Sequence, residues 1–167
     1  PHAEPLPEGA LDLSQLLERG LIVGYPSGTT EGPARPGIVA ESPEARASLG
    51  YLHANCSGCH NRHGPLADLE LDFEQTVAEP GSTERVLRSL IHAPSRYRLP
   101  GAEHSERIVP GRPAESVLAA RLGSRGIVQQ MPPLGSKVVD QEGLLLITSW
   151  IRHQSSTAPY GARKETP

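Results

Sequence analysis

Apolar residues recur at three- and four-residue steps in several stretches of the chain, which is the spacing of amphipathic helices. The clearest stretch follows Ser42-Pro43-Glu44. A hydroxyl N-cap, a proline at the first helical position and an acid in the first turn are typical of a helix start. The apolar face of this predicted helix consists of Ala45, Leu49, Leu52 and Cys56. It leads directly into the cysteine pair of the chain.

The same spacing predicts four further helices: residues 11–19, Thr83 to His92, Pro113 to Gly123, and a last helix that starts after Asp140. Residues 24–42 are crowded with Gly, Pro, Ser and Thr and predict a loop. The segment from Gln154 onward predicts a mobile tail. No β-rich pattern flanks the cysteines. We therefore expect an all-α fold of four to five short helices.

The composition adds long loops and a thin core to this prediction. The 167 residues include 17 glycines and 17 prolines, and hydrophobic residues make up only 37% of the chain. Either a non-protein group completes the core, or part of the chain is an extension. A net charge of −3 argues against a nucleic-acid binder. The longest apolar run, Leu144 to Ile147, is far short of the roughly 18 residues that span a membrane.

The two cysteines stand in Cys56-Ser57-Gly58-Cys59-His60, the C-x-x-C-H pattern of c-type haem attachment. Thiols one helical turn apart can each add to one of the two vinyl groups on a porphyrin edge. The adjacent histidine then lies beneath the ring with its imidazole directed at the iron. We therefore expect Cys56 and Cys59 to hold one haem c covalently, with His60 as an iron ligand.

The cysteine pair also allows three other interpretations: a redox motif, a structural zinc site and a disulfide. A C-x-x-C redox motif is expected in a βαβ context. A structural zinc site needs four ligands, whereas here a second cysteine pair is missing and the histidines are scattered. A disulfide over so short a loop would be strained and would constrain little chain entropy. Haem attachment is favoured over all three.

From these residues onward the chain resembles the monohaem c-type cytochromes. Tyr51-Leu52-His53-Ala54-Asn55 leads into the cysteines, and Gln130-Met131-Pro132-Pro133-Leu134-Gly135 lies far downstream, before Asp140-Gln141-Glu142-Gly143 and Trp150-Ile151. This succession is similar to the distal methionine loop and C-terminal helix of that family. The resemblance covers roughly residues 43–153 and is weak in its middle.

The resemblance implies a cytochrome c-like fold around one covalent haem, with three parts. Residues 1–42 would be an N-terminal extension, mostly loop, residues 43–153 the cytochrome domain, and residues 154–167 a flexible tail. In this family the first and last helices cross closely. Gly143 could allow that approach, opposite the small Ser48, and the less favoured alternative is that Gly143 lies in a frayed first turn.

The sixth iron ligand has one leading candidate and two rivals. Met131 is the only methionine, and its loop is stiffened by two following prolines. A lone methionine more often fills a gap in a core, but the resemblance favours Met131 as the distal ligand. His92 and His104 are the alternatives. The ligands of the iron would then be His60 and Met131, a pair that raises the reduction potential.

The sequence also offers candidate partners for the iron-bound histidine and for the haem carboxylates. The ring N–H of an iron-bound histidine normally donates to a carbonyl or a carboxylate. The Pro65 carbonyl could accept it, although residues 61–66 could equally form an ordinary turn. Arg96 and Arg98 could pair with the haem carboxylates, and solvated loop arginines are the alternative.

The resemblance implies an electron carrier rather than an enzyme. We expect one-electron transfer to and from a redox partner protein. Nucleic acid and a transmembrane segment are not expected. Haem c is attached outside the cytoplasm in bacteria, so a periplasmic or otherwise exported protein is implied. Because the chain begins at Pro1, we expect a mature or trimmed product.

Two other function classes remain open. The chain could be the electron-relay domain of a larger oxidoreductase, related to sugar or alcohol dehydrogenases. It could instead be a ligand-binding or peroxidatic haem protein, which would require Met131 to leave the iron accessible.

Overall fold

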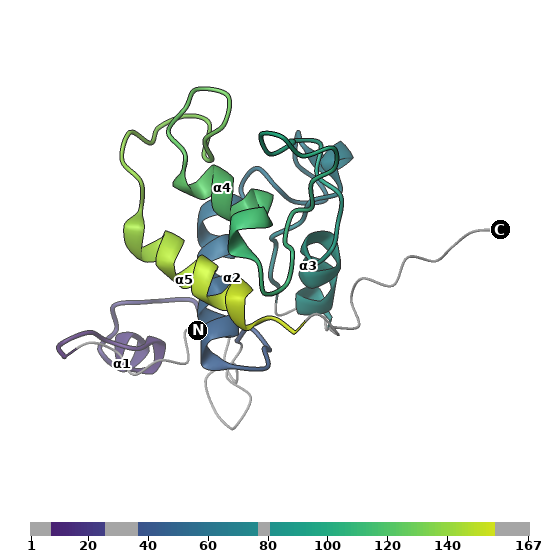
Figure 1. The fold of residues 1–167 in the computed structure, drawn as a ribbon. Helices are drawn as coiled ribbons and strands as arrows, with labels where there is room; N and C mark the ends of the chain where they lie inside the picture. Colours follow the sequence, from purple (N-terminus) through teal and green to yellow (C-terminus); the bar gives the residue numbers. More distant parts are fainter. Residues whose placement is uncertain (1–7, 26–36, 77–80, 156–167) are drawn as a thin grey trace.

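Two helices from opposite ends of the chain pack against each other at the centre of the fold (Figure 1). The structure is a computed structural model, and it describes residues 8–25, 37–76 and 81–155. The helices of these residues are α1 (Leu13–Glu18), α2 (Pro43–Cys56), α3 (Ser82–Leu90), α4 (Val117–Gly123) and α5 (Gln141–His153), with 3-10 turns η1 (Ala67–Leu69) and η2 (Pro113–Glu115). The described residues contain no strand, so the prediction of an all-α protein is confirmed at that level.

The start of α2 follows the predicted capping pattern. Ser42 has extended backbone angles, and its hydroxyl accepts a hydrogen bond of 3.0 Å from the Ala45 N–H. Pro43 stands at the first helical position, where its missing N–H costs nothing. Helix α2 then runs without interruption to Cys56, so it delivers the first cysteine at its last residue.

Helices α2 and α5 cross closely at Gly143. A Cβ atom built on Gly143 would overlap the ring of Tyr51. The neighbour is therefore Tyr51, not the predicted Ser48. The Tyr51 hydroxyl also donates to Asp140 Oδ2 at 3.0 Å, and Asp140 caps α5 by accepting from the Gly143 N–H at 2.9 Å. A hydrogen bond from one helix to the cap of the other fixes the crossing.

The core gathers around this crossing. Its fully buried large side chains come from α2, α3, α5 and the segment between α3 and α4: Leu49, Leu52, Leu90, Ile91, Ile108, Ile147, Trp150 and Ile151. Ile38 and Ala40 pack against it from the side, within the stretch predicted to be an extension. Helix α1, by contrast, has no buried residue.

One predicted helix is divided in the structure. The pattern from Pro113 to Gly123 predicts a continuous helix, but Ser116 has extended backbone angles and separates η2 from α4. The buried Ser116 hydroxyl donates to the Arg112 carbonyl and accepts from the Val109 N–H, both at 2.9 Å. Ser116 is therefore held by the preceding loop, which explains the break.

Part of that loop forms a narrow ribbon that the sequence did not predict. Isolated bridges pair Ile91 with Ile108 and Pro94 with Glu106. The ribbon turns the chain back on itself between α3 and η2 and carries Arg107 to the carbonyls of Leu69 and Glu70.

No helix in the described part of the chain combines the length and apolar character needed to cross a membrane. Most of the predicted tail, residues 156–167, and most of the predicted 24–42 loop, residues 26–36, lie outside the described residues.

Candidate functional site

The C-terminal end of α2 continues into a tight turn that carries the whole C-x-x-C-H motif. The Cys56 carbonyl accepts hydrogen bonds from the Cys59 N–H at 3.2 Å and from the His60 N–H at 2.9 Å. The Asn61 side chain closes the turn by donating to the Ser57 carbonyl at 2.7 Å. One helical turn therefore separates the two sulfur atoms.

Both cysteines are free thiols, and they differ in exposure. Cys56 is half-buried, whereas Cys59 is exposed. Burial, and then the neighbouring Cys59, raise the pKa of Cys56 to about 11. Cys56 is therefore a protonated thiol near neutral pH.

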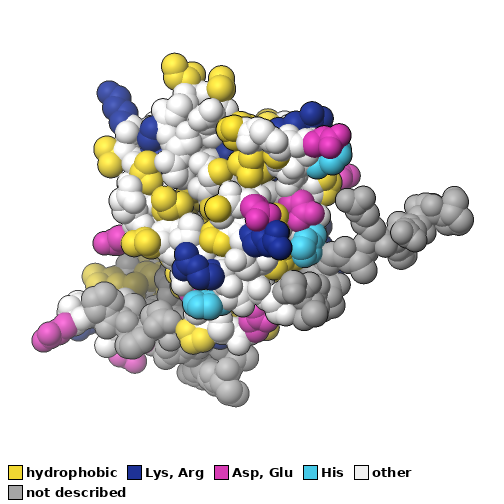
Figure 2. Space-filling model, viewed as in Figure 1, with side chains coloured by type: hydrophobic (Ala, Val, Ile, Leu, Met, Phe, Trp, Pro, Cys, Tyr) yellow, Lys and Arg dark blue, Asp and Glu magenta, His cyan; other side chains and the backbone are white. Residues whose placement is uncertain are grey.

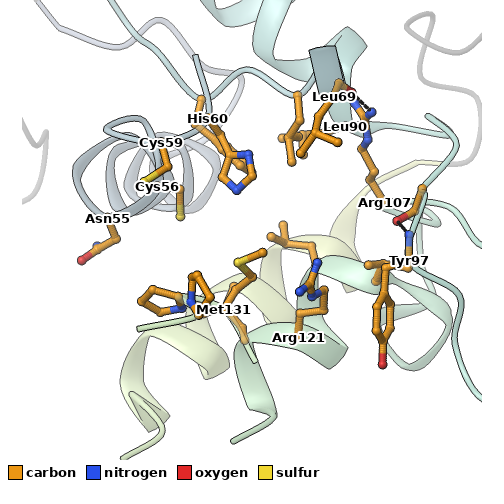
Figure 3. Close-up of a pocket in the computed structure, with 18 of the residues that line it drawn as sticks. Asn55, Cys56, Cys59, His60, Leu69, Leu90, Tyr97, Arg107, Arg121 and Met131 are labelled. Atoms are coloured by element: carbon orange, nitrogen blue, oxygen red, sulfur yellow. Dashed lines mark hydrogen bonds between the residues drawn. The ribbon is translucent and has the colours of Figure 1, made fainter. Parts of the chain in front are cut away.

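A pocket opens directly beside this turn (Figure 3). The empty space between its walls, its open mouth included, is about 1100 Å³. Cys56, Cys59 and His60 form one wall. Much of the further apolar lining comes from Leu69, Leu71, Phe73, Leu90, Val117, Leu118 and Leu122. A mostly apolar pocket with a few polar groups is typical of a cofactor site.

The His60 ring is buried and projects into this pocket. Phe73 holds it from two directions: its ring lies edge-on to His60 at a centroid distance of 5.8 Å, and its N–H donates to the His60 carbonyl at 3.0 Å. Burial, followed by the positive charges of Arg121 and Arg107, lowers the pKa of His60. The neutral imidazole that results is the form that binds a metal ion.

Nδ1 of His60 has no hydrogen-bond partner among the described residues, although it is buried. The interpretation in which the Pro65 carbonyl accepts from this ring is therefore wrong for this structure. A buried ring nitrogen without a partner is costly in a folded protein.

Met131 faces His60 across the pocket, with its sulfur atom directed toward the imidazole ring (Figure 3). The neighbouring prolines Pro132 and Pro133 line the same side. Neither of the rival histidines, His92 and His104, lines the pocket. His92 instead pairs with Glu106 at 2.8 Å.

Three arginines line the pocket: Arg96, Arg107 and Arg121. Figure 3 shows Arg107 and Arg121 on the side away from the cysteines. Arg107 donates to the carbonyls of Leu69, Glu70 and Ser89 at 2.5 to 2.8 Å. The charge of Glu70 stabilises the Arg107 guanidinium, but no carboxylate among the described residues forms a salt bridge with it. Arg96 binds Asp68 at 2.9 Å. Positive charge is thus in excess at this end of the pocket.

This arrangement partly corrects the sequence-based choice of arginines. Arg96 lines the pocket as predicted, but Arg98 does not. Sequence reasoning missed Arg107 and Arg121. For Arg121 a signal existed, because it follows Val117 by four residues and Leu118 by three and so shares their helix face. For Arg107 no local pattern existed, since the ribbon carries it there.

The loop between α4 and α5 is unusually apolar on its outer surface. Its side chains Ile127, Val128, Leu134 and Val138 are all exposed. Figure 2 shows hydrophobic side chains gathered over the upper part of the molecule, where Figure 1 places this loop. The loop that carries Met131 therefore has few side-chain contacts of its own to hold it in place.

Among the described residues, no three His, Cys, Asp or Glu side chains gather at one point. Comparisons of the chain with protein-family models, curated proteins and solved structures give no match. The function is therefore argued from the chain's own residues.

Proposed function

We propose that this protein is a monohaem c-type cytochrome with a cytochrome c-like fold, and that it carries one electron at a time. One observation carries the proposal: a C-x-x-C-H turn opens into an apolar pocket whose opposite wall presents Met131 toward His60. A zinc site, a thiol redox site or a disulfide does not require an apolar pocket of this kind with a methionine facing the histidine.

The residues present fit the chemistry of a haem. A porphyrin has an apolar face, two vinyl groups on one edge and two carboxylates on another. The pocket offers apolar walls, two free thiols at one end and an excess of arginine at the other. Arg107 donates to three carbonyls and forms no salt bridge among the described residues, so a haem carboxylate beside it would add a charge-assisted hydrogen bond.

Each group of residues would have a distinct role. Cys56 and Cys59 would hold the haem covalently, and His60 and Met131 would bind its iron from opposite faces. Bound haem supplies the reversible one-electron iron couple. The apolar side chains of α3 and α4 exclude water, which together with a thioether ligand favours a raised reduction potential.

The proposal extends to partner and location. Nothing in this role requires the chain to act as an enzyme by itself, and the electron would pass to and from a redox partner protein. Because bacteria attach haem c outside the cytoplasm, we assign the protein to the periplasm or another exported location.

The test is a potentiometric titration of the protein produced with a bacterial haem c maturation system. We expect one reversible transition that fits a single-electron equation, and no binding of carbon monoxide to the reduced protein at low concentration. A protein that binds carbon monoxide readily would contradict the carrier role and favour the ligand-binding alternative. A chain that matures without haem would overturn the proposal as a whole.

A further inference from the structure

We propose that Arg121 is a positioning residue for Met131: it ties the loop that carries this methionine to helix α4 and so keeps the sulfur atom directed into the pocket. This inference rests on the proposed function, because it assumes that Met131 is an iron ligand. It adds a residue whose part in the site is not apparent from the motifs.

Two hydrogen bonds join Arg121 of α4 to the loop that carries Met131. The Arg121 carbonyl accepts from the Met131 N–H at 3.0 Å. The Arg121 side chain donates from Nε to the Gln129 carbonyl, also at 3.0 Å. Arg121 therefore binds the loop main chain on both sides of Gln130, at Gln129 and at Met131.

The Arg121 guanidinium is itself held in place by an aromatic ring. Its Cζ atom lies 4.8 Å from the centre of the Tyr97 ring, a distance at which a cation and an aromatic face attract. Tyr97 lies on the segment that follows α3, and both residues line the pocket. Arg121 is thus fixed from one side by Tyr97 and fixes the loop on the other.

Among the described residues, the other hydrogen bonds next to Met131 lie within the loop itself. Gln129 and Gln130 donate their N–H groups to the Gly126 carbonyl, and the Gln130 side chain reaches the carbonyls of Pro132 and Pro133. These bonds shape the loop internally but do not attach it to the rest of the protein.

Arg125 provides a matched comparison within the same loop. Its guanidinium donates to the Val138 carbonyl at 2.9 Å and to the Leu122 carbonyl at 3.0 Å, so it anchors the far end of the loop. It does not line the pocket. Replacing Arg125 removes hydrogen bonds of the same kind, from a guanidinium to main-chain carbonyls, and should leave Met131 in place.

A thioether is a weak, neutral iron ligand, so its binding depends on how well the loop is held. Loss of the charged hydrogen bond to the Gln129 carbonyl should make the sixth position about tenfold easier for an added ligand to occupy. Loss of this hydrogen bond should shift the competition between Met131 and the added ligand, even if the variant and the wild type have the same free energy of unfolding.

The experiment titrates imidazole into the ferric haem-loaded proteins and records the long-wavelength absorption band of a thioether bound to ferric haem. We expect Arg121→Gln to bind imidazole about tenfold more tightly than wild type and to show a weaker band. Arg121→Lys, which can still donate to the Gln129 carbonyl, should recover part of the difference. Arg125→Gln should behave as wild type.

If Arg121→Gln does not mature, Tyr97→Leu removes the support of the guanidinium instead and should change imidazole affinity in the same direction. An intact thioether band with unchanged imidazole affinity in Arg121→Gln, or equal effects of Arg121→Gln and Arg125→Gln, would overturn the role of Arg121 alone. A wild-type protein without the band, whose imidazole affinity matches that of Met131→Ala, would overturn the ligand role of Met131 and the inference with it.

Discussion

At the scale of single residues, the proposed electron-carrier role depends on two side chains that face each other across the pocket, His60 and Met131. His60 is held by Phe73, and burial and two arginines lower its pKa, which favours the neutral imidazole. Met131 opposes it from a loop that is anchored mainly through its main chain. The proposed strong ligand thus lies on a wall with buried packing, and the proposed weak ligand lies on a loop whose outer side chains are exposed.

Replacing Met131 by Ala should open the sixth position to water. We expect the ferric haem to shift toward high spin, the potential to fall, and carbon monoxide to bind the reduced protein. Met131→His is the matched control, because it should keep the iron low-spin while still lowering the potential. If Met131→Ala leaves both spectrum and potential unchanged, another residue holds the distal face.

Residues close in sequence were predicted well at this site, and distant ones less well. Cys56, Cys59 and His60 share one turn, so their grouping follows from the motif itself. Arg107 reaches the pocket only because an irregular ribbon folds back there, and no periodic pattern encodes such a ribbon.

The crossing of α2 and α5 determines where the C-x-x-C-H turn lies relative to the rest of the fold. Tyr51 occupies the space that a side chain at position 143 would need, and its hydroxyl binds Asp140 at the start of α5. Burial, and then this hydrogen bond, raise the pKa of Tyr51 to about 12. The hydroxyl therefore remains a donor throughout the neutral range.

Gly143→Ala should destabilise the protein by about 1–3 kcal/mol, because the added methyl group overlaps the Tyr51 ring. Alanine alone would favour the helix by about 1 kcal/mol. In a Tyr51→Ala background the same change should therefore be neutral or stabilising. Urea unfolding of the four proteins measures this coupling. Equal effects of Gly143→Ala in both backgrounds would contradict the close crossing.

Helix positions followed from the sequence because their apolar faces and caps are local signals. The start of α2 at Pro43 and the start of α5 after Asp140 were both predicted. The division at Ser116 was not, since it depends on hydrogen bonds to Arg112 and Val109 that only the folded loop provides.

At the scale of the whole molecule, the described core and pocket are built from the chain after residue 37. The pocket lining begins at Tyr51, and α1 contributes no buried side chain. Ile38 and Ala40 are exceptions within the predicted extension, because they pack against the core, and the Ile38 carbonyl accepts from Arg46 Nε at 3.0 Å. The thin apolar composition agrees with a core that a porphyrin would complete.

A chain that starts at Gly37 should keep the low-spin spectrum and the potential of the full chain. A chain that starts at Glu41 should keep the spectrum as well but lose about 1–2 kcal/mol of unfolding free energy, because it lacks the packing of Ile38 and Ala40. Visible spectra and urea unfolding of both chains check this. Loss of the low-spin spectrum in the longer chain would mean that the first 36 residues help to form the pocket.

The most direct test of the account is the intact mass of the denatured protein after production with a haem c maturation system. We predict a mass that exceeds the polypeptide by one haem, retained through denaturation because Cys56 and Cys59 form thioether bonds. The Cys56→Ala, Cys59→Ala chain should have the mass of the polypeptide alone. An unmodified wild-type chain with two free thiols, or covalent haem on the double variant, would contradict the central claim.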